Sequence, residues 1–163
     1  MKKKIAILGS TGSIGKNLIE IIKKDKKQFK IELLTANKNY KEILNQAKVF
    51  GVKNIIITDR ESFQKIKRKK LKNIKIFNNF KSLDFIFKKK IDYVMSSISG
   101  IHGLEPTLNI IKYTKIIAIA NKEAIICGWH LIKKDLKKFN TSFIPVDSEH
   151  FSIFYALHKN NIS

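Results

Sequence analysis

The sequence contains few of the residues that cross-link or interrupt a chain. Among its 163 residues are one cysteine, two prolines and seven glycines. A single cysteine, Cys127, excludes an intramolecular disulfide and is typical of a protein of the reducing cytoplasm. We expect Cys127 to be a small buried side chain on a helix and not a nucleophile. Because proline and glycine are scarce, no linker or internal repeat is expected.

Long apolar runs are also missing. No stretch approaches the ~20 consecutive apolar residues that a membrane-spanning helix needs. Three lysines precede an apolar run at residues 5–8, but this run is too short for a secretion signal and leads directly into a glycine-rich loop. Apolar residues still make up 44% of the chain. We therefore expect a folded globular protein with no membrane segment.

Arginine and acidic residues are scarce, and the formal net charge is +20. Such a charge raises the question of nucleic acid as a partner. Only Arg60 and Arg68 among the 33 basic residues are arginine, and the enrichment covers lysine, asparagine, isoleucine and phenylalanine together. These amino acids have A/T-rich codons, so base composition explains the charge. We predict no specific nucleic-acid function, and only nonspecific adhesion to polyanions at low salt.

Short apolar runs alternate with amphipathic segments along the whole chain. Runs of strand length occur at residues 5–8, 31–36, 54–58, 74–77, 93–96, 116–120 and 143–146. Apolar residues at helical spacing occur at 13–24, 41–50, 61–69, 104–113 and 122–139. This alternation is typical of a parallel sheet covered on both faces. It predicts a doubly wound, Rossmann-like α/β fold, whose ligands bind beyond the carboxyl ends of the strands.

A glycine-rich loop follows the first predicted strand and opens the first predicted helix. Residues 9–15 read Gly-Ser-Thr-Gly-Ser-Ile-Gly, a G-x-x-G-x-x-G spacing in place of the commoner G-x-G-x-x-G. Glycines allow a tight turn and close approach to a pyrophosphate, whose charge the free N–H groups and the helix dipole favour. The loop has no P-loop lysine, which disfavours an ATPase. A tight turn without any ligand is the alternative.

The second predicted strand is followed by Asn37, Lys38 and Asn39. An NAD site usually has an acidic residue here, which accepts from the 2′-hydroxyl of the adenosine ribose. A lysine flanked by two amides suits a 2′-phosphate instead. The alternative for Lys38 is a solvated loop lysine, a serious competitor in so lysine-rich a chain.

Two carboxylates follow the last apolar run. Asp147 and Glu149 are two residues apart, so in an extended segment both side chains point to the same side. Carboxylate oxygens are ligands that Mg²⁺ and Mn²⁺ prefer. The alternative is a helix N-cap with acidic first-turn residues.

Four ordered motifs give the chain a family resemblance: GSTGSIG at 9–15, SGIHGLEPTL at 99–108, ANKEAII at 120–126 and PVDSEH at 145–150. Together they resemble 1-deoxy-D-xylulose 5-phosphate reductoisomerase. The resemblance implies an NADPH- and metal-dependent enzyme of the non-mevalonate isoprenoid route. Such an enzyme rearranges 1-deoxy-D-xylulose 5-phosphate and reduces the resulting aldehyde to 2-C-methyl-D-erythritol 4-phosphate.

The resemblance also implies roles for individual residues. Lys122, Asp147 and Glu149 would be catalytic, because a cation on the two carboxylates acts as a Lewis acid and Lys122 stabilises negative charge on substrate oxygen. Mn²⁺ or Mg²⁺ is the expected cation, with Co²⁺ as a further candidate. NADPH would contact Thr11, Gly12, Ser13, Ile14, Asn37, Lys38, Asn39, Asn121 and Glu123, and the sugar phosphate would contact Lys122, Ser148 and Glu149.

Family members are much longer than this chain, and many have Asn-Ala where this chain has Phe151-Ser152. The resemblance implies an NADPH-binding domain at residues 1–140 and the start of a catalytic domain at 141–163. We expect a fragment that binds dinucleotide without turnover, from a cytoplasmic homodimer.

Two alternatives remain open. One is a different NAD(P)-binding reductase, such as a semialdehyde dehydrogenase, which would need a catalytic cysteine. The other is a decayed nucleotide-binding module without activity.

Overall fold

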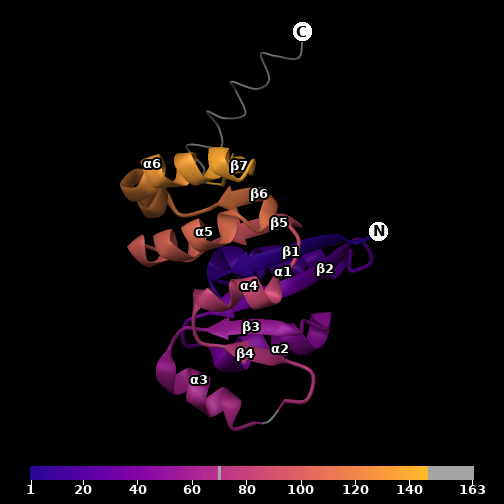
Figure 1. Cartoon of the computed structure of the whole chain (residues 1–163). Coiled ribbons are helices and arrows are strands. Elements are labelled where there is room, and N and C mark those ends of the chain that lie inside the picture. Colours follow the sequence, from indigo (N-terminus) through magenta and orange to yellow (C-terminus); the bar gives the residue numbers. More distant parts are fainter. Residues whose placement is uncertain (70, 147–163) are drawn as a thin grey trace.

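A computed structural model describes residues 1–69 and 71–146. Within these residues, seven strands form one parallel sheet in the order β4-β3-β2-β1-β5-β6-β7 (Figure 1). The order confirms the predicted doubly wound fold. The strands are β1 (Lys3–Leu8), β2 (Phe29–Ala36), β3 (Asn54–Ile57), β4 (Lys75–Phe77), β5 (Ile91–Ser96), β6 (Thr114–Ile119) and β7 (Ser142–Pro145).

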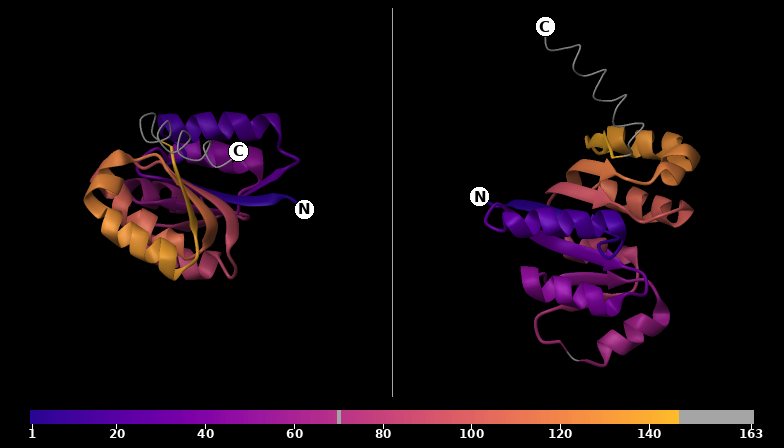
Figure 2. Two further views of the ribbon diagram at one scale, coloured as in Figure 1. Left: turned by 90° about the horizontal axis from the view of Figure 1, so that it is seen from above. Right: turned by 180° about the vertical axis from the view of Figure 1, so that it is seen from behind.

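Helices cover both faces of this sheet. Figure 2 shows α1 and α2 on one side and α5 and α6 on the other. Successive side chains of a strand point to opposite faces of the sheet. Because helices bury both faces, the strands contain runs of consecutive apolar residues and do not alternate between apolar and polar residues. The helices are α1 (Ser13–Lys24), α2 (Tyr40–Phe50), α3 (Arg60–Lys67), α4 (Leu83–Ile86), α5 (Leu104–Ile111) and α6 (Lys122–Lys138), with short 3₁₀ helices η1 (Phe80–Ser82) and η2 (Ile101–Gly103).

The core consists of two apolar layers, one on each face of the sheet. Along β1, Ile5 and Ile7 belong to the layer beneath α1 and α2, and Leu8 belongs to the layer beneath α5 and α6. All three are at most 3% exposed. Such burial contributes about 1.5–3 kcal/mol for each large aliphatic side chain. The two layers make β1 the rigid centre from which the glycine-rich loop projects.

The strand order reverses direction at β1. The chain first builds outward from β1 through β2, β3 and β4, and then returns to place β5, β6 and β7 on the other side of β1. Loops leaving β1 and β5 therefore diverge and leave a crevice at the carboxyl edge of the sheet. The crevice is where a ligand of this fold class binds.

Some expectations from the sequence are corrected or extended. Cys127 is exposed, so the prediction of a buried thiol is wrong. The buried stripe of α6 is Ala124, Gly128 and Ile132, at i, i+4 and i+8, and Cys127 lies beside it. The sequence pattern does not predict the short helices η1, α4 and η2. β7, assigned from the sequence to the start of a second domain, pairs with β6 in the same sheet; the domain division itself stays a prediction.

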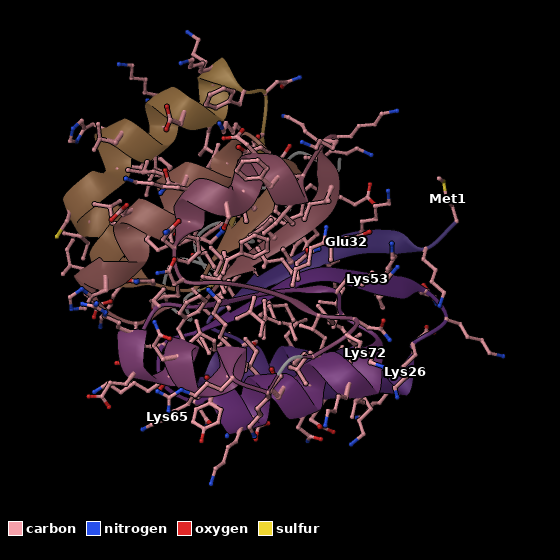
Figure 3. The ribbon with its side chains drawn as sticks, turned by 60° about the horizontal axis from the view of Figure 1, so that its bottom comes forward. Met1, Lys26, Glu32, Lys53, Lys65 and Lys72 are labelled. Atoms are coloured by element: carbon pink, nitrogen blue, oxygen red, sulfur yellow. The ribbon has the colours of Figure 1, made fainter. Side chains whose placement is uncertain are left out.

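The positive charge is spread over the surface. Lys26, Lys53, Lys65 and Lys72 are all exposed, and Figure 3 shows Lys65 on the opposite side of the view from the other three. In the part of the chain that the structure describes, no helix is long and apolar enough to cross a membrane.

Candidate functional site

The glycine-rich loop is the turn from β1 into α1. Gly9 has φ +80°, a left-handed conformation that favours glycine, and the Gly12 amide donates to the Gly9 carbonyl at 3.1 Å. Gly15 is buried against the same turn, where a Cβ would lie 2.6 Å from the Ser10 Cα. Helix and loop are therefore closer together than any larger residue at position 15 would permit.

Two neighbouring elements hold this loop in place. The Ser10 amide donates to the Thr35 carbonyl at 2.9 Å, and the Gly9 amide donates to the Thr35 hydroxyl at 2.9 Å. From α2, the buried Gln46 side chain donates to the Ser10 carbonyl at 3.0 Å. These bonds fix the peptide groups on either side of Ser10. Thr35 and Gln46 are supporting residues that the sequence motif does not reveal.

Among the described α-helices of eight or more residues, α1 alone has neither a side-chain cap nor an acidic residue in its first turn; α5 also lacks a cap but has Glu105 there. Side-chain oxygens of Asn39, Asp59 and Asn121 accept from the first turns of α2, α3 and α6. α1 begins after Gly12, with no side-chain cap and no acidic residue in its first turn. The first amides of a helix have no intrahelical partner. The amide groups of Ser13, Ile14 and Gly15 are thus left for an anion, favoured further by the helix dipole.

A cleft of about 660 Å³ runs along the carboxyl edge of the sheet from the loops after β3 and β4, past the glycine-rich loop, to the loop after β5. Its volume suits an extended dinucleotide. Of the residues predicted to bind cofactor, Thr11, Gly12 and Asn37 line it. The sequence prediction missed most of its other walls, which are Gly9, Thr35, Ala36, Thr58, Asn78, Asn79, Phe80, Ser97, Ile98, Ser99, His102, Glu105 and Pro106.

The three residues of the predicted adenosine end are all exposed, and two of them make side-chain hydrogen bonds. Asn37 donates to the Thr58 hydroxyl at 2.8 Å, and the Asn39 side-chain oxygen accepts from the Glu42 amide at 3.2 Å. Lys38 is exposed beside them. Its ammonium group is therefore available to a ligand.

An acidic residue also lies close to Lys38, in the loop after β3 and not in the loop after β2. The Asp59 carboxylate accepts from the Ser62 amide at 2.9 Å. That hydrogen bond, with the charges of Lys38 and Lys65, lowers the pKa of Asp59 below its usual value. Asp59 is thus an ionised neighbour of Lys38 that the sequence prediction did not include.

Beyond β6 the structure brings together the two motifs that contain residues 99–108 and 120–126. The Asn121 side chain is buried, and it donates to the Ile98 and Gly100 carbonyls. Lys122 and Glu123 follow on the exposed first turn of α6. α6 therefore starts beside the loop after β5, at the far end of the cleft from Lys38.

The predicted metal ligands Asp147 and Glu149, and the predicted substrate contact Ser148, lie outside the described residues. Within the described part of the chain, no group of three or more histidine, cysteine, aspartate or glutamate side chains could hold a metal ion. β7 ends at Pro145, beside β6, so the chain leaves the sheet at its carboxyl edge. That is the edge at which Asn121 and Lys122 lie.

Comparisons with known proteins agree with this geometry. The sequence model of the 1-deoxy-D-xylulose 5-phosphate reductoisomerase family matches residues 5–128. The reductoisomerase of Pelagibacter ubique is 65% identical over 162 residues, which are 97% of this chain and 42% of the relative. That of Wolbachia from Culex pipiens is 37% identical over 161 residues, 98% of this chain and 41% of the relative. The chain thus spans about two fifths of the curated relatives it matches.

Solved structures are similar over most of the chain. The Zymomonas mobilis reductoisomerase in complex with NADPH superposes with a TM-score of 0.83 at 29% identity, covering 92% of this chain and 40% of that one. A reductoisomerase with NADPH, fosmidomycin and magnesium gives 0.79 at 31% identity, covering 91% and 37%. A homoserine dehydrogenase of S. aureus, at 18% identity and a TM-score of 0.52, shares the fold alone. Since the family model matches residues 5–128 and the solved reductoisomerases superpose on most of the chain, the chain belongs to the 1-deoxy-D-xylulose 5-phosphate reductoisomerase family.

Proposed function

We propose that this chain binds NADPH along the cleft, with the pyrophosphate on the first turn of α1. The uncapped amides of Ser13, Ile14 and Gly15 are the observation that carries this proposal. Thr11 and Gly12 line the cleft beside them. Lys38, Asn37 and Asn39 receive the adenosine ribose and its 2′-phosphate. The relative from Zymomonas mobilis was solved with NADPH, which supports the assignment.

We further propose that the chain contributes this cofactor site to the isomerisation and reduction of 1-deoxy-D-xylulose 5-phosphate to 2-C-methyl-D-erythritol 4-phosphate. NADPH supplies the hydride. Lys122, on the exposed first turn of α6, stabilises negative charge on a substrate oxygen, and Glu123 beside it faces the cofactor. The exposed Cys127 does not line the cleft, which disfavours chemistry through a cysteine nucleophile.

Asp147 and Glu149 are the proposed ligands of Mg²⁺ or Mn²⁺, with Ser148 and Glu149 also contacting the sugar phosphate. Two carboxylates at this spacing are a suitable donor set for a hard divalent cation. Such a cation supplies Lewis-acid polarisation of substrate oxygens. We also propose the division into residues 1–140 and 141–163, a homodimer for the longer protein, and a cytoplasmic location.

The choice of NADPH over NADH depends on Lys38. Asp59 offers an acceptor that would suit the 2′-hydroxyl of NADH, and Lys38 offers a cation that suits the 2′-phosphate of NADPH. A charge-assisted contact contributes about 1.5–3 kcal/mol, which is roughly 10- to 150-fold in affinity. We therefore expect Lys38→Glu to abolish or reverse the preference for NADPH.

The test is to titrate the 163-residue chain with NADPH and NADH and to follow its melting temperature. Ligand at 100 times its Kd stabilises by about 2.7 kcal/mol, which raises the melting temperature by roughly 5–10 °C. Lys53→Glu is the matched control, because it makes the same charge change at an exposed lysine before β3, at the opposite edge of the sheet. If neither dinucleotide shifts the melt, the cofactor proposal fails. If Lys53→Glu lowers the affinity for NADPH as much as Lys38→Glu does, the preference for NADPH depends on the net charge of the protein and not on Lys38.

A further inference from the structure

Both polar atoms of the Asn121 side chain are hydrogen-bonded within the protein. Its two amide protons go to the carbonyl oxygens of Ile98 and Gly100, the latter at 2.6 Å. Its side-chain oxygen accepts from the Ala124 amide at 2.9 Å, which caps α6. The residue is 3% exposed. Both donors and the cap acceptor are therefore occupied before any cofactor arrives.

The surrounding backbone is shaped to fit this side chain. At Gly103, in η2, a Cβ would clash with the Asn121 side-chain nitrogen and lie 2.5 Å from the Ile98 carbonyl oxygen. Gly100 has φ +69°, so the loop turns at a residue for which that conformation is inexpensive. The buried Asn121 side chain thus bonds the loop after β5 to the start of α6, and η2 packs closely against it.

These segments belong to one half of the cleft. Strand order places the β1 loop between β2 on one side and β5 and β6 on the other. With the pyrophosphate on α1 and the adenosine toward Lys38, the nicotinamide half must extend toward β5 and β6. Ile98 and Ser99 line the cleft there, and both lie in the loop that Asn121 holds.

We propose that Asn121 is a positioning residue: its side chain holds the loop 97–100 in the shape that receives the nicotinamide half of the cofactor, and ties that loop to the start of α6. Any contact between Asn121 and the cofactor is left to its backbone. This inference rests on the proposed function, because it assumes that the dinucleotide is the ligand.

Two variants disrupt the hydrogen bonds between Asn121 and the loop 97–100, one by changing Asn121 and the other by changing its neighbour Gly103. Asn121→Ser keeps a hydroxyl acceptor for the cap of α6 but removes both donors to the loop. Gly103→Ala leaves Asn121 unchanged and displaces its amide. NADPH and 2′,5′-ADP are the probes, since 2′,5′-ADP has the adenosine half and its 2′-phosphate but no nicotinamide. Binding is measured by titration, and the nicotinamide emission spectrum reports the environment of the bound ring.

We expect each variant to lower the affinity for NADPH five- to thirtyfold and to shift the emission spectrum of bound NADPH. The affinity for 2′,5′-ADP should change by less than twofold. The double variant should bind NADPH no more weakly than the weaker-binding single variant, because both substitutions disrupt the same hydrogen bonds. Retained NADPH affinity in Gly103→Ala, with a loss in Asn121→Ser, would show a direct side-chain contact and overturn the proposal. An equal loss of both ligands would show a merely structural role and also overturn it. If the parent chain binds neither ligand, the proposed function itself is wrong.

Discussion

Gly15→Ala should damage the proposed cofactor site although alanine is the better helix former. Gly15 is the third residue of α1 and is buried against the glycine-rich loop. A Cβ there would clash with the Gly9 carbonyl oxygen and lie 2.6 Å from the Ser10 Cα and 2.8 Å from the Ser10 carbonyl carbon. All three atoms belong to the backbone. Since Gln46 and Thr35 hold that backbone through hydrogen bonds, it cannot move aside without breaking them.

The size of the effect follows from two opposing terms. Replacing glycine by alanine within a helix gains about 1 kcal/mol. Forcing a methyl group into a filled space costs about 1–3 kcal/mol, and the upper part of that range applies where backbone must shift. The net loss of stability is then about 1–2 kcal/mol, or a fall of roughly 2–8 °C in melting temperature. Loss of one hydrogen bond to a charged phosphate would cost a further 10- to 150-fold in NADPH affinity, by the roughly 1.5–3 kcal/mol that such bonds contribute.

Gly128→Ala is the matched control, because Gly128 is also a buried helical glycine. A Cβ at that position would clash with one Leu104 methyl group and lie 2.8 Å from the other and 3.1 Å from the Leu104 Cγ, all of them side-chain atoms. A leucine side chain can rotate away, and the site lies in α6, away from α1. Because the repacking of Leu104 and the gain in helix propensity oppose each other, we expect a change in stability smaller than that of Gly15→Ala, and none in NADPH affinity. Thermal melts and NADPH titrations of both variants decide the matter: parental affinity and an unchanged or higher melting temperature in Gly15→Ala would refute the reasoning.

Two further predictions concern acidic residues. Asp92 accepts from the Lys115 ammonium at 2.8 Å and the Lys4 amide at 2.8 Å, and these bonds lower its pKa. A carboxylate with a lowered folded-state pKa stabilises the protein above its unfolded pKa and loses that contribution as the pH falls through the folded-state pKa. Asp92→Asn should therefore lower the melting temperature slightly at pH 7 and leave it unchanged in strong acid; an equal drop at both pH values would contradict this. In a protein extended to the length of the relatives, Asp147→Asn should greatly reduce Mn²⁺-dependent turnover and retain NADPH binding, whereas a lower melting temperature with turnover intact would indicate a helix cap.

Periodicity located nearly every element of the fold, since long apolar runs and amphipathic stretches allow few other arrangements. The helix predicted at residues 13–24 has the observed bounds. Short elements such as α4, only four residues long, carry too little periodicity to be recognised. Cys127 was misassigned because α6 has apolar side chains off its buried stripe, among them Ile126, which is 72% exposed. A single sequence does not show which of several possible stripes faces the core.

The site was predictable where its residues adjoin a motif, and not where the fold brings distant residues together. The glycine-rich loop could be located from its glycines and its place between an apolar run and an amphipathic segment, and the structure has it as the turn from β1 into α1; its role in binding a cofactor stays a prediction. Asp59 lies beside Lys38 although 21 positions separate the two residues in the sequence, and Asn78, Asn79 and Phe80 reach the cleft from the loop after β4. None of these residues has a local signature. Their positions depend on the order of the strands, which alternation of elements does not specify.

The uncapped start of α1 has a consequence for the rate of binding. Where a side chain caps a helix, an incoming phosphate has to displace that side chain and wait for it to rotate away. At Gly12 there is no such side chain, so an arriving anion exchanges only with water. NADPH, the proposed cofactor, is a tetra-anion, and its attraction to a protein of net charge +20 should accelerate their encounter at low ionic strength. Association should therefore be set by diffusion and electrostatic steering, and differences in affinity among variants should reside mainly in the dissociation rate.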